Sequence, residues 1–88
     1  MPESPNAADT LAWAYYQKGL YDSAIDLLQE AVRKVPQNAT YRYHLGLAYQ
    51  RVSKVALARQ SFQQALLIDP NSKRADEIRH TLADLTSN

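Results

Sequence analysis

The sequence predicts an all-α protein of antiparallel helix–turn–helix repeats, with about five helices in its 88 residues. Prolines stand at positions 2, 36 and 70, a spacing of 34 residues (36 − 2 and 70 − 36), and a fixed period of this size is typical of stacked repeats. Within each period the apolar residues recur every three or four positions, which is the spacing of a helical face. No segment alternates with a period of two, so no strand is expected.

A shift of 34 residues places similar residues on one another along most of the chain. Small residues fall on small ones and large apolar residues on large ones, so each period is expected to fold as the same pair of helices. The matched pairs are Leu11 with Leu45, Ala12 with Gly46, Ala14 with Ala48, Tyr15 with Tyr49, Ala24 with Ala58, Leu28 with Phe62, Ala31 with Ala65 and Val32 with Leu66.

The first pair of helices is expected at residues 7–18 and 22–34. Gly19 separates the two helices, because glycine readily adopts the backbone conformation that ends a helix. Pro36 follows the second helix and prevents its continuation, because proline lacks the N–H that the next hydrogen bond requires.

The second pair is expected at residues 39–52 and 55–68, with Asn38 as the N-cap of the first and Pro70 after the second. A fifth helix is expected at 73–85, following possible cap oxygens in the Asn-Ser pair after Pro70. Its single apolar stripe, with polar residues elsewhere, is typical of a helix that caps a repeat array. The stripe consists of Ala75, Ile78, Leu82 and Leu85.

Small residues in the middle of the helices predict close helix packing. Ala12 and Gly46 stand where a large side chain would hold the neighbouring helix away, and Ala24 and Ala58 supply the opposing small surface. The helices are therefore expected to lie near the short end of the usual separation of about 8–10 Å.

The register divides the chain into four segments. Residues 1–4 look like the end of a preceding repeat or a linker, 5–38 form the first repeat, 39–72 form the second, and 73–88 form a capping helix and tail. Because no cap precedes the first repeat, we expect the sequence to come from the C-terminal end of a longer array.

Composition excludes several classes of function. The formal charge of +1 argues against a nucleic-acid partner, and the absence of cysteine excludes disulfides and thiolate zinc sites. Two glycines are too few for a glycine-rich nucleotide loop. No apolar run approaches the roughly 20 residues of a membrane span, and residues 1–6 lack the character of a signal peptide. We therefore expect no membrane insertion and a soluble, by default cytoplasmic, protein.

The titratable residues form no catalytic or metal-binding motif. His44 and His80 are the only histidines and have no converging ligands nearby, whereas a metal site needs three or four. Asp22 and Asp26 lie one helical turn apart, where their charge favours a helix N-terminus. No base is placed to activate a serine. The sequence therefore predicts no enzyme activity, cofactor or metal.

The repeated residues resemble the tetratricopeptide repeat (TPR) family. The resemblance covers about residues 5–72 and departs from the family pattern at Ala8 and Arg42, where tryptophan is frequent, and at Ser53, which replaces a usual glycine. The residues that match are Leu11, Ala12, Tyr15, Ala24, Leu28, Ala31 and Pro36, and then Leu45, Gly46, Tyr49, Ala58, Phe62, Ala65 and Pro70.

The resemblance implies a concave groove, lined by the first helices of successive repeats, that holds a peptide or helix of another protein. The chain is therefore expected to be a non-catalytic protein–protein interaction scaffold. Asp9 and Ile78 fall on the same face. The candidate partner-binding residues carried over by register are Trp13, Tyr16, Gln17, Tyr43, His44, Leu47, Gln50, Arg51 and Arg74.

Two alternatives accompany this expectation. The first is that the chain is a self-assembly module, which stacks through its N-terminal repeat to form homo-oligomers. The second is that Trp13 packs inside the array and does not bind a partner. The excess of positive charge in residues 39–72 favours a partner segment of mildly acidic character.

Chaperone-binding members of the family grip a C-terminal carboxylate with a clamp of lysine, asparagine and arginine. This chain has Asp9, Trp13, His44 and Ile78 at clamp positions, and only Arg74 fits. The resemblance therefore does not extend to recognition of Hsp70 or Hsp90 tails.

Overall fold

The computed structural model describes residues 4–86 and confirms the all-α prediction. The described part of the chain contains five helices and no strand, and the helix ends differ from the predicted ones by at most two residues. The helices are α1 (Pro5–Gln17), α2 (Tyr21–Lys34), α3 (Ala39–Arg51), α4 (Val55–Ile68) and α5 (Ala75–Thr86).

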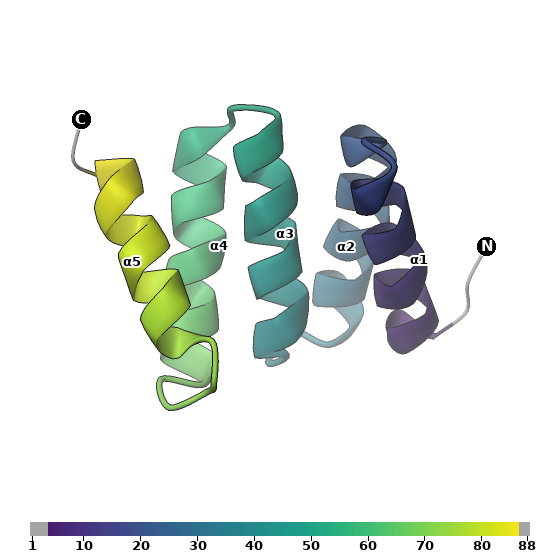
Figure 1. Cartoon of the computed structure of the whole chain (residues 1–88). Coiled ribbons are helices and arrows are strands. Elements are labelled where there is room, and N and C mark those ends of the chain that lie inside the picture. The colour runs from purple at the N-terminus through teal and green to yellow at the C-terminus, as the bar shows by residue number, and fades with distance from the viewer. Residues whose placement is uncertain (1–3, 87–88) are drawn as a thin grey trace.

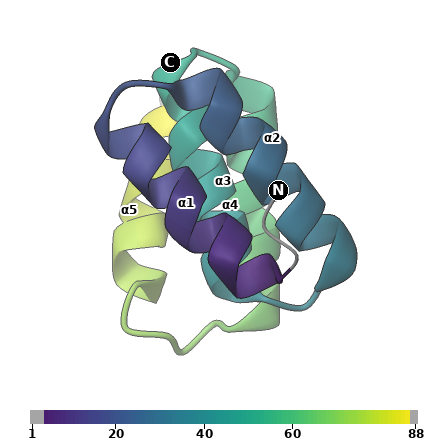
Figure 2. The same cartoon turned by 90° about the vertical axis from the view of Figure 1, so that its right-hand side faces the viewer.

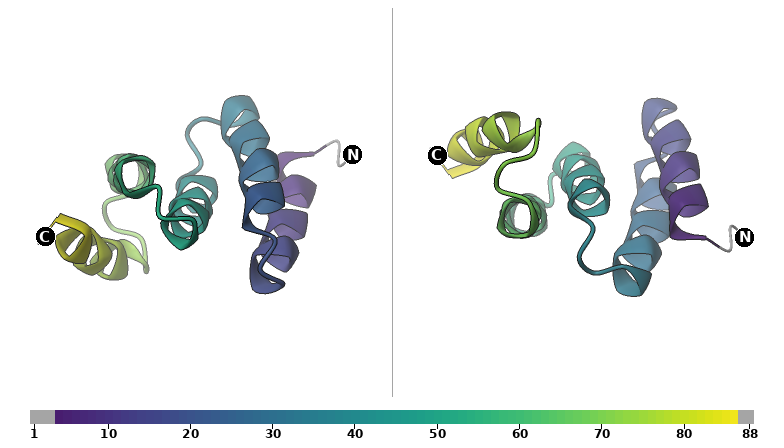
Figure 3. Two further views of the ribbon diagram at one scale, coloured as in Figure 1. Left: turned by 90° about the horizontal axis from the view of Figure 1, so that it is seen from above. Right: turned by 90° about the horizontal axis from the view of Figure 1, so that it is seen from below.

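The helices form an elongated array in the order of the sequence (Figure 1). Each helix packs against the next, and α1 also contacts α3, the corresponding helix of the next pair. Figure 2 views the array along its length from the α1 end. The views from above and below place α1 and α5 at opposite ends of a body that measures 38 × 25 × 19 Å (Figure 3). In this arrangement α1, α3 and α5 lie along one side of the array (Figure 3).

Side-chain caps define where the first helix of each pair begins. Asn38 caps α3 as predicted, because its side-chain oxygen accepts a hydrogen bond from the Tyr41 backbone N–H at 3.0 Å. Ser4 does the same for α1 by accepting from the Ala7 N–H at 3.0 Å. Pro5 then occupies the first helical position, where its missing N–H costs nothing, so α1 begins two residues earlier than predicted.

The turns inside the two helical pairs adopt the same left-handed conformation. Gly19 has φ of 83° and Ser53, the residue 34 positions later, has φ of 62°. Glycine adopts this conformation freely, whereas the Cβ of serine is crowded there. The departure from the family pattern at Ser53 therefore preserves the turn at an energetic cost.

Replacing Ser53 by glycine is expected to raise the free energy of unfolding by up to about 1 kcal/mol, because the strain at positive φ is removed. Urea denaturation followed by circular dichroism measures the change. Ser23→Gly is the matched control: Ser23 lies in α2, where the same exchange is expected to destabilise by about 0.5 kcal/mol. A loss of stability in Ser53→Gly would show that the serine conformation is not strained.

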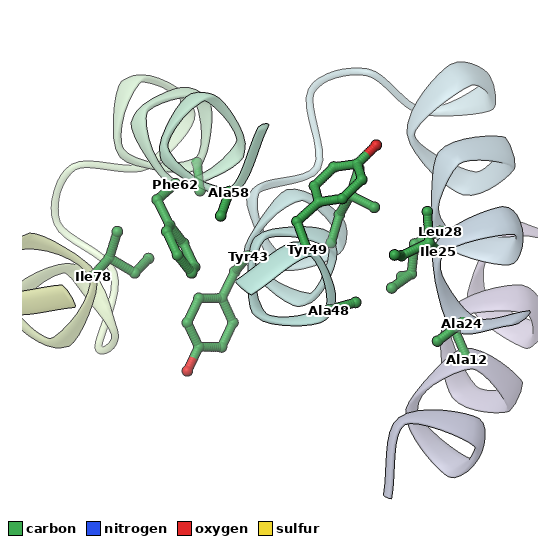
Figure 4. Packing of buried hydrophobic residues seen from close by; sticks show 12 residues of the cluster. Ala12, Ala24, Ile25, Leu28, Tyr43, Ala48, Tyr49, Ala58, Phe62 and Ile78 are labelled. Atoms are coloured by element: carbon green, nitrogen blue, oxygen red, sulfur yellow. The ribbon is translucent and has the colours of Figure 1, made fainter. Parts of the chain in front are cut away.

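The core lies between the helices along the whole array (Figure 4). Ala12, Ala24 and Ala58 are fully buried, as expected for residues at close helix contacts. The ring of Phe62 is also fully buried and extends from α4 toward α3 and α5. A Cβ built on Gly46 would lie 2.6 Å from Phe62 Cε1, so this glycine makes room for the ring.

Candidate partner-binding site

Three side-chain hydrogen bonds between described residues join α1 to α3, each between residues 35 positions apart. The two helices occupy the same place in successive repeats, so these bonds cross the boundary between the repeats. The contacts are Tyr41 with Asn6 through the tyrosine hydroxyl, His44 Nδ1 with Asp9 Oδ1 at 2.7 Å, and Arg51 Nε donating to the Tyr16 hydroxyl at 3.3 Å.

A continuous row of aromatic rings crosses this boundary, and we call it the aromatic ladder. It runs from the start of α2 through α1 to α3. Its members are Tyr21, Tyr16, Trp13, His44 and Tyr43. The successive ring centroids lie 5.5, 4.9, 4.6 and 5.7 Å apart, which is the range of favourable aromatic contact.

Trp13 lies at the centre of the aromatic ladder. Its ring stacks on Tyr16 with an interplanar angle of 7° and on His44 with an angle of 27°. The ring is only partly buried, and its indole N–H donates no hydrogen bond to the residues that the structure describes. Trp13 therefore combines packing within the repeats with an accessible surface and a free donor.

An arginine stands over each end of the aromatic ladder. The Arg51 guanidinium carbon lies 5.3 Å from the Tyr21 ring centroid and 5.6 Å from that of Tyr16, and the Arg74 carbon lies 5.2 Å from the Tyr43 ring centroid. These are distances of favourable cation–π attraction. The hydrogen bond with the Tyr16 hydroxyl raises the pKa of Arg51 further, so its charge is permanent.

Tyr43 is the most deeply placed member of the ladder, with 8% of its surface exposed. Its hydroxyl donates to Glu77 Oε1 of α5 at 2.8 Å. Burial is the main cause that raises the pKa of Tyr43 to about 12, and the bond to Glu77 acts in the same direction. In Figure 4 the hydroxyl groups of Tyr43 and Tyr49 point in opposite directions from α3. Tyr43 therefore ties α5 to α3.

A cavity of about 350 Å³ opens beside Tyr43 where α3 begins and α5 starts. Basic and hydroxyl groups share its wall with apolar ones. The lining residues are Ala39, Thr40, Tyr43, Asp69, Ser72, Lys73, Arg74 and Ile78.

The remaining predicted site residues differ in exposure. Gln17, Gln50 and Arg51 are exposed, Leu47 is half-buried and packs against the core, and Ile78 is buried. The structure therefore brings Trp13, Tyr16, Tyr43, His44, Arg51 and Arg74 together, and we call their surface the first-helix face.

Sequence reasoning missed Tyr21 and Glu77, which contact Arg51 and Tyr43 respectively. The repeat register contains a signal for Glu77, because it stands 34 positions after Tyr43. Tyr21 belongs to a second helix and carries no such signal.

The described residues hold no group of three or more side chains suited to a metal ion. None of the helices in that part of the chain has the length and apolar character that a bilayer-spanning segment needs.

Comparison with known proteins supports the repeat assignment. A tetratricopeptide repeat family model matches residues 10–73. The tetratricopeptide repeat domain-containing protein PYG7, chloroplastic, of Arabidopsis thaliana is 33% identical over 76 residues, which are 86% of this chain and 25% of that protein. The chain thus spans a quarter of the length of this relative.

Solved structures share the fold. The first TPR of Spaghetti (RPAP3), bound to the HSP90 peptide SRMEEVD, matches with a TM-score of 0.85 and 22% identity over 94% of this chain and 66% of that one. The Yersinia enterocolitica translocator chaperone SycD, in an alternative dimer, matches with a TM-score of 0.78 and 22% identity over 99% and 71%. With two helical pairs in 34-residue register and a family model that spans both, the chain belongs to the tetratricopeptide repeat family.

Proposed function

We propose that the chain is a non-catalytic scaffold that binds a segment of another protein on the first-helix face. The observation that carries the proposal is the aromatic ladder centred on Trp13, which presents ring surface and an unused indole N–H beside two cations. Large aromatic side chains and arginine dominate binding energy where a partner covers them. The ladder is also held rigid by its own stacking, so little entropy is lost on binding.

The RPAP3 domain shows that the same fold holds a peptide, but of the clamp residues for an acidic tail this chain has only Arg74. Asp9 is engaged by His44 at 2.7 Å, and Ile78 is 3% exposed. A ligand carboxylate at the Asp9 position would meet a negative charge, and one at the Ile78 position would meet a covered apolar side chain. The ligand we propose is therefore an internal segment rather than a chain terminus.

Selection from a random dodecapeptide phage library on the full chain tests this proposal. Enriched peptides are expected to bind the parent chain and to lose roughly tenfold or more in affinity to Trp13→Ala, because the central ring is removed. Leu67→Ala removes an exposed apolar side chain from α4 and is the matched control. Circular dichroism verifies that Trp13→Ala stays helical. Peptides that bind a folded Trp13→Ala variant with unchanged affinity would contradict the proposal.

A second candidate function rests on the outer face of α1. Ala48, Tyr49 and their neighbours on α3 are buried where α2 packs, and Gln29 of α2 donates to the Tyr49 hydroxyl at 2.7 Å. The residues 34 positions earlier are similar, but Ala14 is exposed and Tyr15 is half-buried. We propose that a second copy of the chain packs on this face, as α2 packs on α3. The SycD dimer is a precedent within the fold.

Self-association is therefore expected as the concentration approaches the millimolar range, because repeat interfaces supply much of the stability of such arrays. Sedimentation equilibrium measures the molecular mass against concentration. Ala14→Arg is expected to restore the monomer, whereas Ala56→Arg, at an exposed alanine of α4, is expected to leave association unchanged. At about 1 mM, an association free energy of only about −4 kcal/mol gives a substantial dimer population. A parent chain that stays monomeric at this concentration would therefore exclude this function.

A further inference from the structure

Arg51 and Arg74, the two arginines of the first-helix face, carry charges that no carboxylate in residues 4–86 pairs with. Arg51 donates only to the neutral Tyr16 hydroxyl. Arg33 and Arg79, by contrast, each pair with an acidic side chain on their own helix.

Both guanidinium groups are held in place by rings. Each lies 5.2–5.6 Å from a tyrosine ring centroid, and such cation–π contacts restrict a side chain that is otherwise flexible. An arginine that is already oriented loses less entropy when it binds a carboxylate. The pair is therefore suited to a ligand that supplies two negative charges.

The structure also sets the spacing of those charges. Tyr43, under Arg74, and Arg51 are eight residues apart on α3, which corresponds to a rise of about 12 Å. Three ring contacts of 4.6–5.7 Å connect Tyr43 to Tyr16, under Arg51. The two sites thus lie on the order of 12–15 Å apart, a span that an extended chain covers in about four residues of 3.3 Å each.

We infer that the partner segment is extended and carries two acidic side chains four positions apart, one for Arg51 and one for Arg74, with apolar residues between them over Trp13. This inference rests on the proposed function and specifies its ligand. The central rings provide the apolar contact, and each guanidinium provides a charge-assisted hydrogen bond.

The end of the site at Arg74 is the better formed of the two. The 350 Å³ cavity there includes Lys73 and Arg74 together with the hydroxyl-bearing residues Thr40 and Ser72, against the single carboxylate of Asp69. The excess of donors favours an acidic side chain in this cavity. Tyr43 and Ile78 supply the apolar wall for its methylene groups.

Two synthetic peptides of identical composition test the spacing. The first, acetyl-Ser-Gly-Glu-Leu-Pro-Leu-Glu-Gly-Ser-amide, places its glutamates four positions apart, and the second, acetyl-Ser-Gly-Leu-Glu-Glu-Pro-Leu-Gly-Ser-amide, places them side by side. Titration into the full chain is followed by emission of Trp13, the single tryptophan. The spaced peptide is expected to bind roughly 5–10-fold more tightly, because only it reaches both arginines.

Arg51→Gln and Arg74→Gln are each expected to weaken the spaced peptide by roughly 5–10-fold and to abolish its advantage over the adjacent one. Arg33→Gln makes the same change of charge at an exposed ion pair of α2 and is expected to change neither affinity. If the two peptides bind with equal affinity and both change the emission of Trp13, the spacing inference is overturned, while peptide binding by the first-helix face still stands. Absence of any effect on Trp13 would overturn the inference, while the library selection decides the proposed function independently.

Discussion

Replacing Phe62 by alanine is expected to lower the free energy of unfolding by about 3–5 kcal/mol, because the change removes the transfer energy of the ring and leaves a cavity. The ring is fully buried and lies where α3, α4 and α5 meet (Figure 4). A chain of this length has a total stability on the order of 4–13 kcal/mol, so the change removes a large share of it.

Chemical denaturation followed by circular dichroism at 222 nm, a wavelength that reports helix content, measures this loss. Leu67→Ala is the matched control, because Leu67 lies on the same helix and is 75% exposed. Its expected change lies within about 0.5 kcal/mol. Similar losses in the two variants would mean that Phe62 is not the centre of the core.

Replacing Gly46 by alanine is expected to destabilise the protein by up to about 2 kcal/mol. The new Cβ would lie 2.6 Å from Phe62 Cε1 and 2.8 Å from Cδ1 of a ring that is fully buried, and such overpacking costs about 1–3 kcal/mol. The gain of about 1 kcal/mol that alanine normally provides over glycine in a helix offsets part of this cost.

The first repeat contains the compensating pair. Ala12 and Leu28 stand 34 positions before Gly46 and Phe62 and are equally buried. Introducing Phe62→Leu into Gly46→Ala is therefore expected to recover much of the lost stability. A double-mutant cycle measured by urea denaturation should give a coupling energy of about 0.5–3 kcal/mol in the compensating direction. Strictly additive effects would show that the two residues do not constrain each other.

Most of the fold is predictable because it depends on short-range patterns that repeat. The 34-residue register and the helical spacing of small and apolar residues predict all five helices. The apolar pattern places the start of α1 two residues late, although Ser4 stands 34 positions before Asn38 and caps its helix in the same way. It places the start of α5 two residues early, because the chain forms turns before Ala75.

The site is less predictable because its contacts join different helices. Register identifies the face of Trp13 and His44, but not that Tyr43 is buried, with 8% of its surface exposed. The hydrogen bonds between α1 and α3 run at an offset of 35, so that Asp9 meets His44 and Tyr16 meets Arg51, whereas Tyr43 of α3 meets Glu77 of α5 at an offset of 34. The repeat period of one sequence does not give the offset of 35.

Binding of a partner segment to the first-helix face is directly observable by two-dimensional ¹H–¹⁵N NMR of the full chain with a peptide from the library selection. The chain has one tryptophan, so its indole N–H gives a single side-chain signal. We expect this signal to shift during the titration together with backbone signals of α1, α3 and the start of α5. A stationary indole signal, with shifts confined to exposed α4 residues such as Leu57 and Leu67, would contradict binding at this face.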